Sequence, residues 1–329
     1  MANNNVKKFK RIGVLTSGGD APGMNAAVRA VTRAALARGV KVMGIYNGYD
    51  GLMYDDMKLF HMRDVSNIIS RGGTVLYSAR AVEFKTEEGM AKAIAVCKKN
   101  HIDGIVAIGG DGTFRGATDL TVRGIPCIGI PGTIDNDISS TDYTIGFDTA
   151  MNTVKEAIDR IKDTAYSHER CSVVEVMGRN AGYIAINCAI AGGAEACIIP
   201  EKNFDVGEDI IKPILACRNA GKHHYIVINA EGVGGTMEIA EEIRQKTGIS
   251  TNTTILGHLQ RGGSPTVRDR VAASLMGAKA TELLSQGIAG KIIAMKGDSV
   301  VDIDIEEALE MQKSIDEHLI RTSKILSLY

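Results

Sequence analysis

The apolar residues of this chain gather into short runs that alternate with longer amphipathic segments. Runs that are typical of strands buried on both faces lie at Ile12–Leu15, Val40–Ile45, Gly104–Ile108 and Ile125–Ile130. Helices are predicted between them, from Met24 to Ala35 with apolar residues on one face, and at Glu87–Lys99 and Phe114–Val122. The first half of the chain therefore predicts alternating strands and helices.

The second half repeats this alternation. Predicted helices lie near Asp148–Ala165, Ala181–Ala191, Gly207–Arg218 and Met237–Gln245. Predicted strands lie at Ser172–Val176, Ala196–Ile199, Tyr225–Ala230 and Thr254–Leu256. Alternation of this kind predicts an α/β fold of two similar lobes, each a mainly parallel sheet flanked by helices. The active site is expected in the cleft between the lobes.

No linker rich in proline, serine or charge separates the lobes, so we expect crossing segments near residues 145 and 258 to join them. The first lobe is predicted to comprise residues 1–145 plus about 259–309. The second lobe is predicted to comprise residues 146–258 plus about 310–329. The terminal helical region, Ile305–Leu326, is interpreted as ordinary packing.

Composition narrows the class of protein. A length of 329 residues exceeds the usual size of a single core, and a net charge of −1 gives no argument for nucleic acid or an anionic membrane as partner. No apolar run approaches a membrane span, and Met1–Lys10 is interpreted as neither signal peptide nor anchor. The 6 cysteines form no C-x-x-C pair and are expected to be reduced, buried thiols of a cytoplasmic protein.

Glycine-rich polar loops follow several of the predicted strands, at Thr16–Asn25, Gly109–Thr113, Pro131–Asp137 and Met177–Gly182. Backbone N–H groups of such loops, at the start of a helix, bind anions. The carboxylate of Asp111 suits Mg²⁺, and the planar guanidinium of Arg179 suits a phosphoryl group in transfer.

The loop Pro131–Asp137 is the most informative stretch of the chain. Asp135 and Asp137 are two residues apart, so in an extended segment they would share one face and could divide the work of proton acceptor and orienting or metal-binding group. Alone, the loop is equally consistent with a polar turn that caps the next helix. Together, the four loops indicate phosphoryl transfer with Mg²⁺.

Seven segments, TSGGDAPGMN, SAR, IGGDGT, PGTIDND, SHER, MGRNAG and LGHLQRGGSP, occur in an order and spacing that resemble bacterial phosphofructokinases. The resemblance runs from about Ile12 to about Ile293. It implies a cytoplasmic homotetramer that transfers a phosphoryl group from ATP to the 1-hydroxyl of fructose 6-phosphate, with Mg²⁺. It also implies that the first lobe binds the nucleotide and the second lobe binds the sugar phosphate.

The resemblance also implies roles for individual positions. Asp135 resembles the general base, Thr133 and Asp137 its companions, and Arg179 the residue that stabilises the moving phosphoryl group. The ATP-binding positions are Gly19, Arg80, Ala81, Gly110, Asp111, Gly112 and Thr113, with Asp111 as the Mg²⁺ ligand. The substrate positions are Thr133, Ile134, Asp135, Arg170, Met177, Gly178, Arg179, Glu231, Asn252, His258, Leu259, Gln260 and Arg261.

Two of these positions concern a neighbouring subunit. Arg170 resembles the arginine that reaches in from that subunit. Asn252 stands where the family has a second such arginine, so sugar-phosphate binding is expected to be weakened or altered.

The effector positions of the family are only partly retained. The candidate effector residues are Arg29, Arg33, Lys162, Gly193, Glu195, Lys222 and His224, and of these Arg29, Arg33, Gly193, Glu195 and Lys222 match the family. Met62, with Arg63 adjacent, and Ala220 replace basic residues, and Lys162 replaces an arginine. We therefore expect a weak or absent response to ADP or phosphoenolpyruvate.

Two alternatives stay open. The nearest is a phosphofructokinase that uses pyrophosphate, whose relatives carry a larger side chain after the loop acid and a lysine after the proline of PGTIDND. Gly112 and Gly132 instead leave room for the adenosine end of ATP. The other alternative is a catalytically silent nucleotide sensor or structural subunit, which is disfavoured by the presence of Asp111, Asp135, Asp137 and Arg179.

Overall fold

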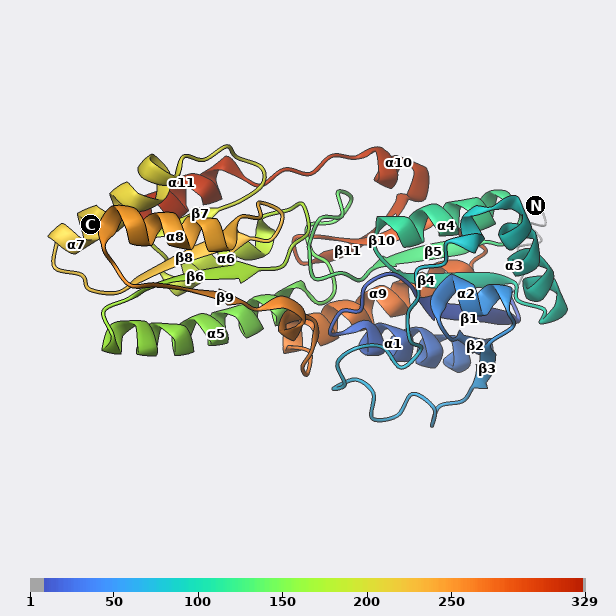
Figure 1. The fold of residues 1–329 in the computed structure, drawn as a ribbon. Coiled ribbons are helices and arrows are strands. Elements are labelled where there is room, and N and C mark those ends of the chain that lie inside the picture. The colour runs from blue at the N-terminus through green and yellow to red at the C-terminus, as the bar shows by residue number, and fades with distance from the viewer. Residues whose placement is uncertain (1–8, 328–329) are drawn as a thin grey trace. The chain divides into compact units, whose positions relative to one another are not determined.

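The structure, a computed structural model, describes residues 9–327. The described chain divides into two compact units (Figure 1). The first unit contains the chain up to Ile134, Ile138–Thr149 and Arg261–Lys313. The second contains Asp135–Asp137, Ala150–Gln260 and the segment from Ser314. The expectation that Met1–Lys10 is neither signal peptide nor anchor falls mostly outside the described residues.

The first unit is built on a seven-stranded sheet with the order β11-β10-β5-β4-β1-β2-β3. Its parallel strands are β1 (Arg11–Thr16), β2 (Lys41–Ile45), β4 (Gly104–Gly109), β5 (Cys127–Pro131) and β10 (Lys291–Lys296). The two edge strands, β3 (Met57–Phe60) and β11 (Ser299–Asp304), run antiparallel to their neighbours. The sheet is therefore mainly parallel, as predicted.

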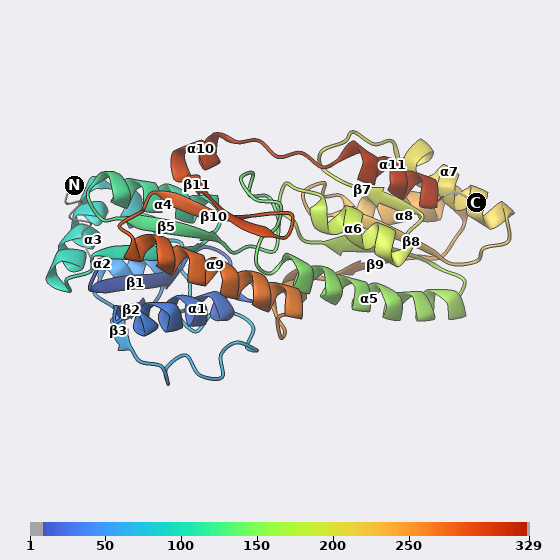
Figure 2. The same cartoon turned by 180° about the vertical axis from the view of Figure 1, so that it is seen from behind.

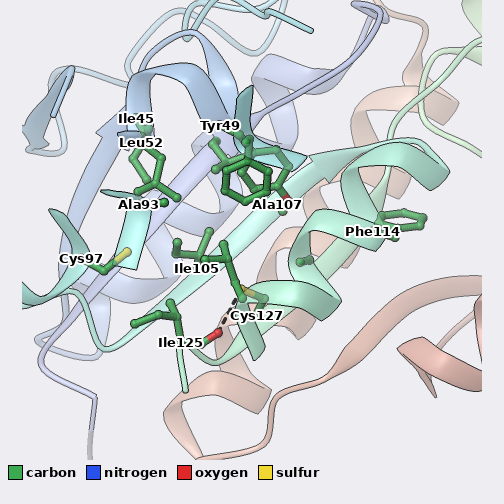
Figure 3. Close-up of a cluster of buried hydrophobic side chains, with 14 of the residues drawn as sticks. Ile45, Tyr49, Leu52, Ala93, Cys97, Ile105, Ala107, Phe114, Ile125 and Cys127 are labelled. Carbon is green, nitrogen blue, oxygen red and sulfur yellow. Dashed lines mark hydrogen bonds between the residues drawn. The ribbon is translucent and has the colours of Figure 1, made fainter. Parts of the chain in front are cut away.

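Helices cover both faces of this sheet. On one face lie α1 (Met24–Ala37) and α9 (Val267–Ser285), side by side in both views (Figures 1 and 2). On the other face lie α2 (Gly48–Met53), α3 (Glu87–Lys99), α4 (Asp111–Val122) and α10 (Ile305–Glu310), with a 3₁₀ turn at Glu83–Lys85. Alternate residues of β4 point to opposite faces, and Ile105 and Ala107 face the second group of helices (Figure 3).

The second unit is built on a four-stranded parallel sheet with the order β7-β8-β6-β9. Its strands are β6 (Cys171–Val176), β7 (Ala196–Ile198), β8 (Tyr225–Ala230) and β9 (Thr251–Ile255). Its helices are α5 (Phe147–Ser167), α6 (Tyr183–Gly192), α7 (Lys212–Asn219), α8 (Thr236–Thr247) and α11 (Glu317–Leu326), with a 3₁₀ turn at Gly257–Arg261. Two α/β units with mainly parallel sheets confirm the predicted fold class.

Several elements differ from the sequence-based expectation. β3, the β10–β11 hairpin and α9 were not predicted. The predicted helix Gly207–Arg218 is divided into a π-helical turn, Val206–Ile211, and α7. Pro213, in the first turn of α7, has no N–H to donate to the preceding turn, which accounts for the change of helix type. The region 305–326 is not one helix either, because the extended segment 311–316 separates α10 from α11.

Five of the six cysteines are buried, as expected, while Cys197 is half-buried. Within residues 9–327, no helix is both long and apolar enough to cross a membrane.

Candidate active site

Two glycine-rich loops meet at one end of the first sheet. β1 and β4 are neighbouring parallel strands with Thr16 opposite Ile108, so the loops that follow them start side by side. The Ser17 N–H donates to the Ile108 carbonyl (2.9 Å), and the Thr113 hydroxyl donates to the Ser17 carbonyl (3.2 Å). These hydrogen bonds hold the loop 16–25 against the loop 109–113.

The second of these loops leads directly into α4. Gly110 is the N-cap residue and offers no side-chain cap, so the first turn of α4 presents backbone N–H groups and the positive end of the helix dipole. Asp111 and Gly112 are both exposed at this turn. A Cβ atom added to Gly112 would meet no atom within 4 Å. The start of α4 is thus an open, anion-compatible surface with one carboxylate on it.

The start of the loop Pro131–Asp137 is fixed by backbone contacts. Gly132 donates its N–H to the Gly109 carbonyl (3.0 Å) and forms a parallel bridge with Ile145. The Ile145 N–H donates to the Pro131 carbonyl (3.0 Å), and the Thr144 hydroxyl donates to the Thr133 carbonyl (2.6 Å). Residues 131–133 are therefore held between the end of β4 and the segment 144–145.

The expected conformation of the two acids in this loop was wrong. We expected an extended segment with Asp135 and Asp137 on one face, but Asn136 between them has a φ of 52°. This left-handed conformation turns the chain, so the alternation of an extended strand does not apply. Thr133, Ile134 and Asp135 are buried, while Asp137 is half-buried.

Asp137 belongs to the second unit together with Tyr183, the first residue of α6. Burial raises the pKa of Tyr183 to about 12, and the carboxylates of Glu201 and Asp137 add to the rise. The Asp137 carboxylate therefore interacts electrostatically with the first residue of α6.

In the second unit, two side chains hold the backbone of the loop that carries Arg179. The Glu231 carboxylate accepts the N–H groups of Gly178 (3.2 Å) and Arg179 (2.7 Å). The Gln260 side-chain oxygen accepts the N–H of Met177 (3.0 Å). Arg179 itself has a φ of 57° and is exposed. The structure therefore brings Met177, Gly178, Arg179, Glu231 and Gln260 together.

Arg261 makes a contact that the resemblance did not indicate. Its guanidinium Nη1 donates to the Asp20 carbonyl (3.0 Å), within the first unit. The residue predicted to contact the sugar phosphate therefore also touches the predicted nucleotide loop, next to Gly19. His258 and Leu259, in the 3₁₀ turn before Arg261, are exposed.

The remaining predicted nucleotide and sugar-phosphate residues lie on several different elements. Arg80 is exposed and Ala81 half-buried, after a loop whose Ser78 hydroxyl donates to the Gly18 carbonyl. Arg170 is half-buried just before β6. Asn252 is exposed on β9, at the edge of the second sheet, and lines a cavity of about 1130 Å³ with residues of α8. None of the other predicted sugar-phosphate residues lines this cavity.

Five of the predicted effector residues lie in the second unit. Lys222 forms an ion pair with the buried Glu195, and Glu195 also accepts the Ile226 N–H (2.6 Å). Burial, together with the charge of Lys222, lowers the pKa of His224. A Cβ atom on Gly193 would lie 3.6 Å from Nζ of Lys162. The other predicted effector residues, Arg29 and Arg33, lie on α1 of the first unit.

Sequence reasoning missed the function of Asn25, which is buried at the start of α1. Its side-chain amide donates to the carbonyls of Arg71 (3.0 Å) and Gly72 (3.2 Å), and its oxygen accepts the Val75 N–H (2.7 Å). These bonds hold the long loop that leads to Arg80. The only signal in the sequence was the place of Asn25 within TSGGDAPGMN.

Among residues 9–327, no group of three or more His, Cys, Asp or Glu side chains could hold a metal ion by itself. In phosphoryl-transfer sites, Mg²⁺ is ordinarily bound through one or two carboxylates plus substrate phosphates and water, and not by an all-protein cage. The exposed carboxylate of Asp111 at the start of α4 fits such a site.

Comparison with known proteins gives the family. The profile of the family described as Phosphofructokinase matches residues 11–284. ATP-dependent 6-phosphofructokinase 1 of Clostridium perfringens is 56% identical over 311 residues, 94% of this chain and 97% of that protein. ATP-dependent 6-phosphofructokinase of Halalkalibacterium halodurans is 54% identical over 97% of this chain and 100% of that protein.

Solved structures agree with the sequences. The structure of phosphofructokinase from Saccharomyces cerevisiae superimposes with a TM-score of 0.87 at 31% identity, covering 97% of this chain and 47% of that one. With a family profile that matches most of the chain and relatives more than half identical along nearly all of it, this protein belongs to the phosphofructokinase family.

Proposed function

We propose that this protein transfers a phosphoryl group from ATP to the 1-hydroxyl of fructose 6-phosphate, as an ATP-dependent 6-phosphofructokinase. The observation that carries the proposal is the adjacency of β5, β4 and β1. The loops with PGTIDND, GGDGT and TSGGDAPGMN begin at the carboxyl ends of these three strands. In open α/β sheets, ligands bind at that end of the strands. The names of the Clostridium and Halalkalibacterium relatives support the same activity.

In this proposal, the loops after β1 and β4 bind ATP. Backbone N–H groups at the start of α4 face the phosphates, and Gly19, Arg80, Ala81 and Thr113 complete the nucleotide site. Asp111 would hold Mg²⁺, which supplies neutralisation of the charge on the phosphate oxygens when bound.

Asp135 acts as the general base that takes the proton of the sugar hydroxyl, with Thr133 and Asp137 as companions. Phosphoryl transfer passes through a loose transition state, so a base has modest leverage and charge stabilisation matters more. Arg179 provides that stabilisation. The hydrogen bonds from its backbone and that of Gly178 to Glu231 support this role, because they fix where the side chain starts.

The sugar phosphate is bound by Met177, Gly178, Glu231, His258, Leu259, Gln260 and Arg261, with Ile134 beside the base. Arg170 and Asn252 act across a subunit boundary in a homotetramer, and a cytoplasmic location is part of the same proposal. An uncharged Asn252 gives a weaker contact with phosphate than an arginine would.

A coupled assay that compares two phosphoryl donors tests the proposal. Purified protein is supplied with fructose 6-phosphate, Mg²⁺ and either ATP or pyrophosphate, and the formation of fructose 1,6-bisphosphate is followed. We expect turnover with ATP and little or none with pyrophosphate. Turnover with pyrophosphate alone would identify a pyrophosphate-dependent enzyme, and no turnover with either donor would favour a catalytically silent subunit.

A further inference from the structure

Asp269 is a completely buried acid at the start of α9, with 0% of its surface exposed. Its carboxylate accepts the Tyr143 hydroxyl and the Gly146 N–H (2.7 Å) on one oxygen. The other oxygen accepts the N–H (2.9 Å) and the hydroxyl of Thr149. A buried carboxylate is costly unless it is hydrogen-bonded, and here four donors from one segment satisfy it.

An acid at the third residue of a helix, where Asp269 lies in α9, ordinarily accepts a hydrogen bond from the start of its own helix. In a capping box, the third helical residue accepts the backbone N–H of the N-cap residue. Thr266 is the N-cap of α9, and its hydroxyl accepts the Asp269 N–H (3.3 Å). The Thr266 N–H, however, donates to the Thr149 hydroxyl (3.0 Å) and not to Asp269. The carboxylate of Asp269 is therefore committed to the segment 143–149 and not to its own helix.

The segment 143–149 is also the one that holds the start of the PGTIDND loop. Ile145 bridges Gly132 and donates to the Pro131 carbonyl, and the Thr144 hydroxyl donates to the Thr133 carbonyl (2.6 Å). The donors to Asp269 lie on both sides of residues 144 and 145. Asp269 thus anchors a segment whose middle fixes residues 131–133, and Thr133 is two residues before Asp135.

The start of α1 packs against both the segment 143–149 and Asp269. A Cβ atom on Gly23 would lie 2.6 Å from Cγ2 of Ile145 and 3.4 Å from Cβ of Asp269. The Arg268 guanidinium lies over the Tyr143 ring, 4.6 Å from its centroid. Close packing on these sides means that the segment 143–149 has little room to shift as long as the carboxylate holds it.

We propose that Asp269 is a positioning residue for phosphoryl transfer, which sets the PGTIDND loop through the segment 143–149 and so fixes the place of Asp135. This proposal rests on the proposed function. Asp269 does not touch substrate in this account. Its effect arises because a displacement of about 1 Å in a reacting group can cost about 10²-fold in rate.

The test uses Asp269→Asn in the full-length protein, with Thr281→Val as the matched control. Asparagine keeps the shape but turns an NH₂ group toward at least one pair of donors. Thr281 is buried on the same helix, and its hydroxyl donates to the Gly277 carbonyl (2.9 Å) and the Val31 carbonyl (3.4 Å), away from the loop. We expect Asp269→Asn to lower kcat by about 10- to 100-fold with the KM for ATP within about threefold. Thr281→Val should leave kcat within about twofold at a similar loss of Tm.

Amide hydrogen exchange of residues 131–145 gives a readout that does not depend on activity. We expect exchange there to rise in Asp269→Asn and not in Thr281→Val. If the asparagine variant does not fold, Tyr143→Phe removes a single donor and should give a smaller change in the same direction. Thr149→Val removes one donor to Asp269 together with the acceptor of the Thr266 N–H, and should also change exchange in that direction.

The outcomes separate the two proposals. A wild-type protein that makes no fructose 1,6-bisphosphate refutes the proposed function, and the exchange measurement then still decides the role of Asp269. Unchanged exchange of residues 131–145 in a folded Asp269 variant overturns the positioning role. So does a loss of kcat that Thr281→Val reproduces at equal Tm.

Discussion

Replacement of Gly112 by aspartate tests whether the start of α4 admits ATP, without disturbing the fold. Gly112 is the second residue of α4, is exposed, and does not have a positive φ. Its added Cβ would meet no atom within 4 Å. An acid in the first turn of a helix typically stabilises it by about 0.3–1 kcal/mol. We therefore expect the Tm of Gly112→Asp to be unchanged or slightly raised.

The expected effect on ATP binding follows from repulsion between the new carboxylate and the phosphates. The new carboxylate would stand at the start of α4, where the proposal puts the phosphates. Two unit charges about 4 Å apart interact by about 4 kcal/mol at an effective dielectric constant of about 20. Even if solvent and side-chain movement remove two thirds of this repulsion energy, about 1.4 kcal/mol remains. A loss of that size corresponds to a tenfold lower affinity for ATP. We expect the KM for ATP to rise by about tenfold or more.

The assay is a steady-state titration of ATP at saturating fructose 6-phosphate, with Gly112→Ala and Gly112→Asn as controls for bulk and polarity. An unchanged KM for ATP in Gly112→Asp would refute the claim that Gly112 admits the nucleotide. Equal effects of alanine and aspartate would refute the role of charge. Gly132 is less suitable, because its added Cβ would lie 3.1 Å from Cγ2 of Ile108 and 3.2 Å from Cε of Met24.

Three further predictions follow from the site and its surroundings. Asp135→Asn should lower kcat by about 10²–10⁴-fold with little change in ATP affinity, and turnover within a few-fold of wild type would show that Asp135 is not the base. Saturation curves for fructose 6-phosphate should shift little with millimolar ADP or phosphoenolpyruvate, and a large shift that Arg29→Ala abolishes would contradict this expectation. The Gly297 N–H, and secondarily Lys296, lower the pKa of Asp142 below 3.8 in the folded protein. The ionised Asp142 carboxylate therefore stabilises the fold above pH 3.8, and this stabilisation is lost as the pH falls through the lower pKa of the folded state. Asp142→Asn should therefore lower Tm at pH 7, with a difference from wild type that narrows in acid, and thermal unfolding that shows a constant difference would contradict this.

The strands that could be predicted are those whose burial is visible in the sequence. The run Gly104–Ile108 differs from β4 by one residue, because every residue of this strand is buried and apolar or glycine. α9 could not be recognised in this way. Its buried face is made largely of small residues such as Ala272, Ala273 and Gly277, while Val271 and Leu275 are 51% and 48% exposed. A helix that packs through small residues has no apolar periodicity to detect.

Within the candidate site, the sequence did not indicate how the residues are held. Glu231 and Arg179 are 52 residues apart, and Asp269 and Gly146 are 123 apart. Contacts over such distances depend on how the segments pack, and no local pattern records them. The left-handed conformation of Asn136 could not be predicted from the sequence either, because asparagine tolerates this conformation but does not require it.

The close approach of α1 and α9 has a mechanical consequence. A Cβ atom on Gly277 would lie 2.8 Å from Cβ of Ala30 and 3.0 Å from the Ala27 carbonyl oxygen, so the two helices touch backbone to side chain with no layer of bulky residues between them. Helices packed this tightly move as one body and not as sliding neighbours. Arg29 lies beside that contact, and Asp269 lies two helical turns before Gly277. A displacement of α1 as a whole would therefore be shared by α9, the helix that carries Asp269.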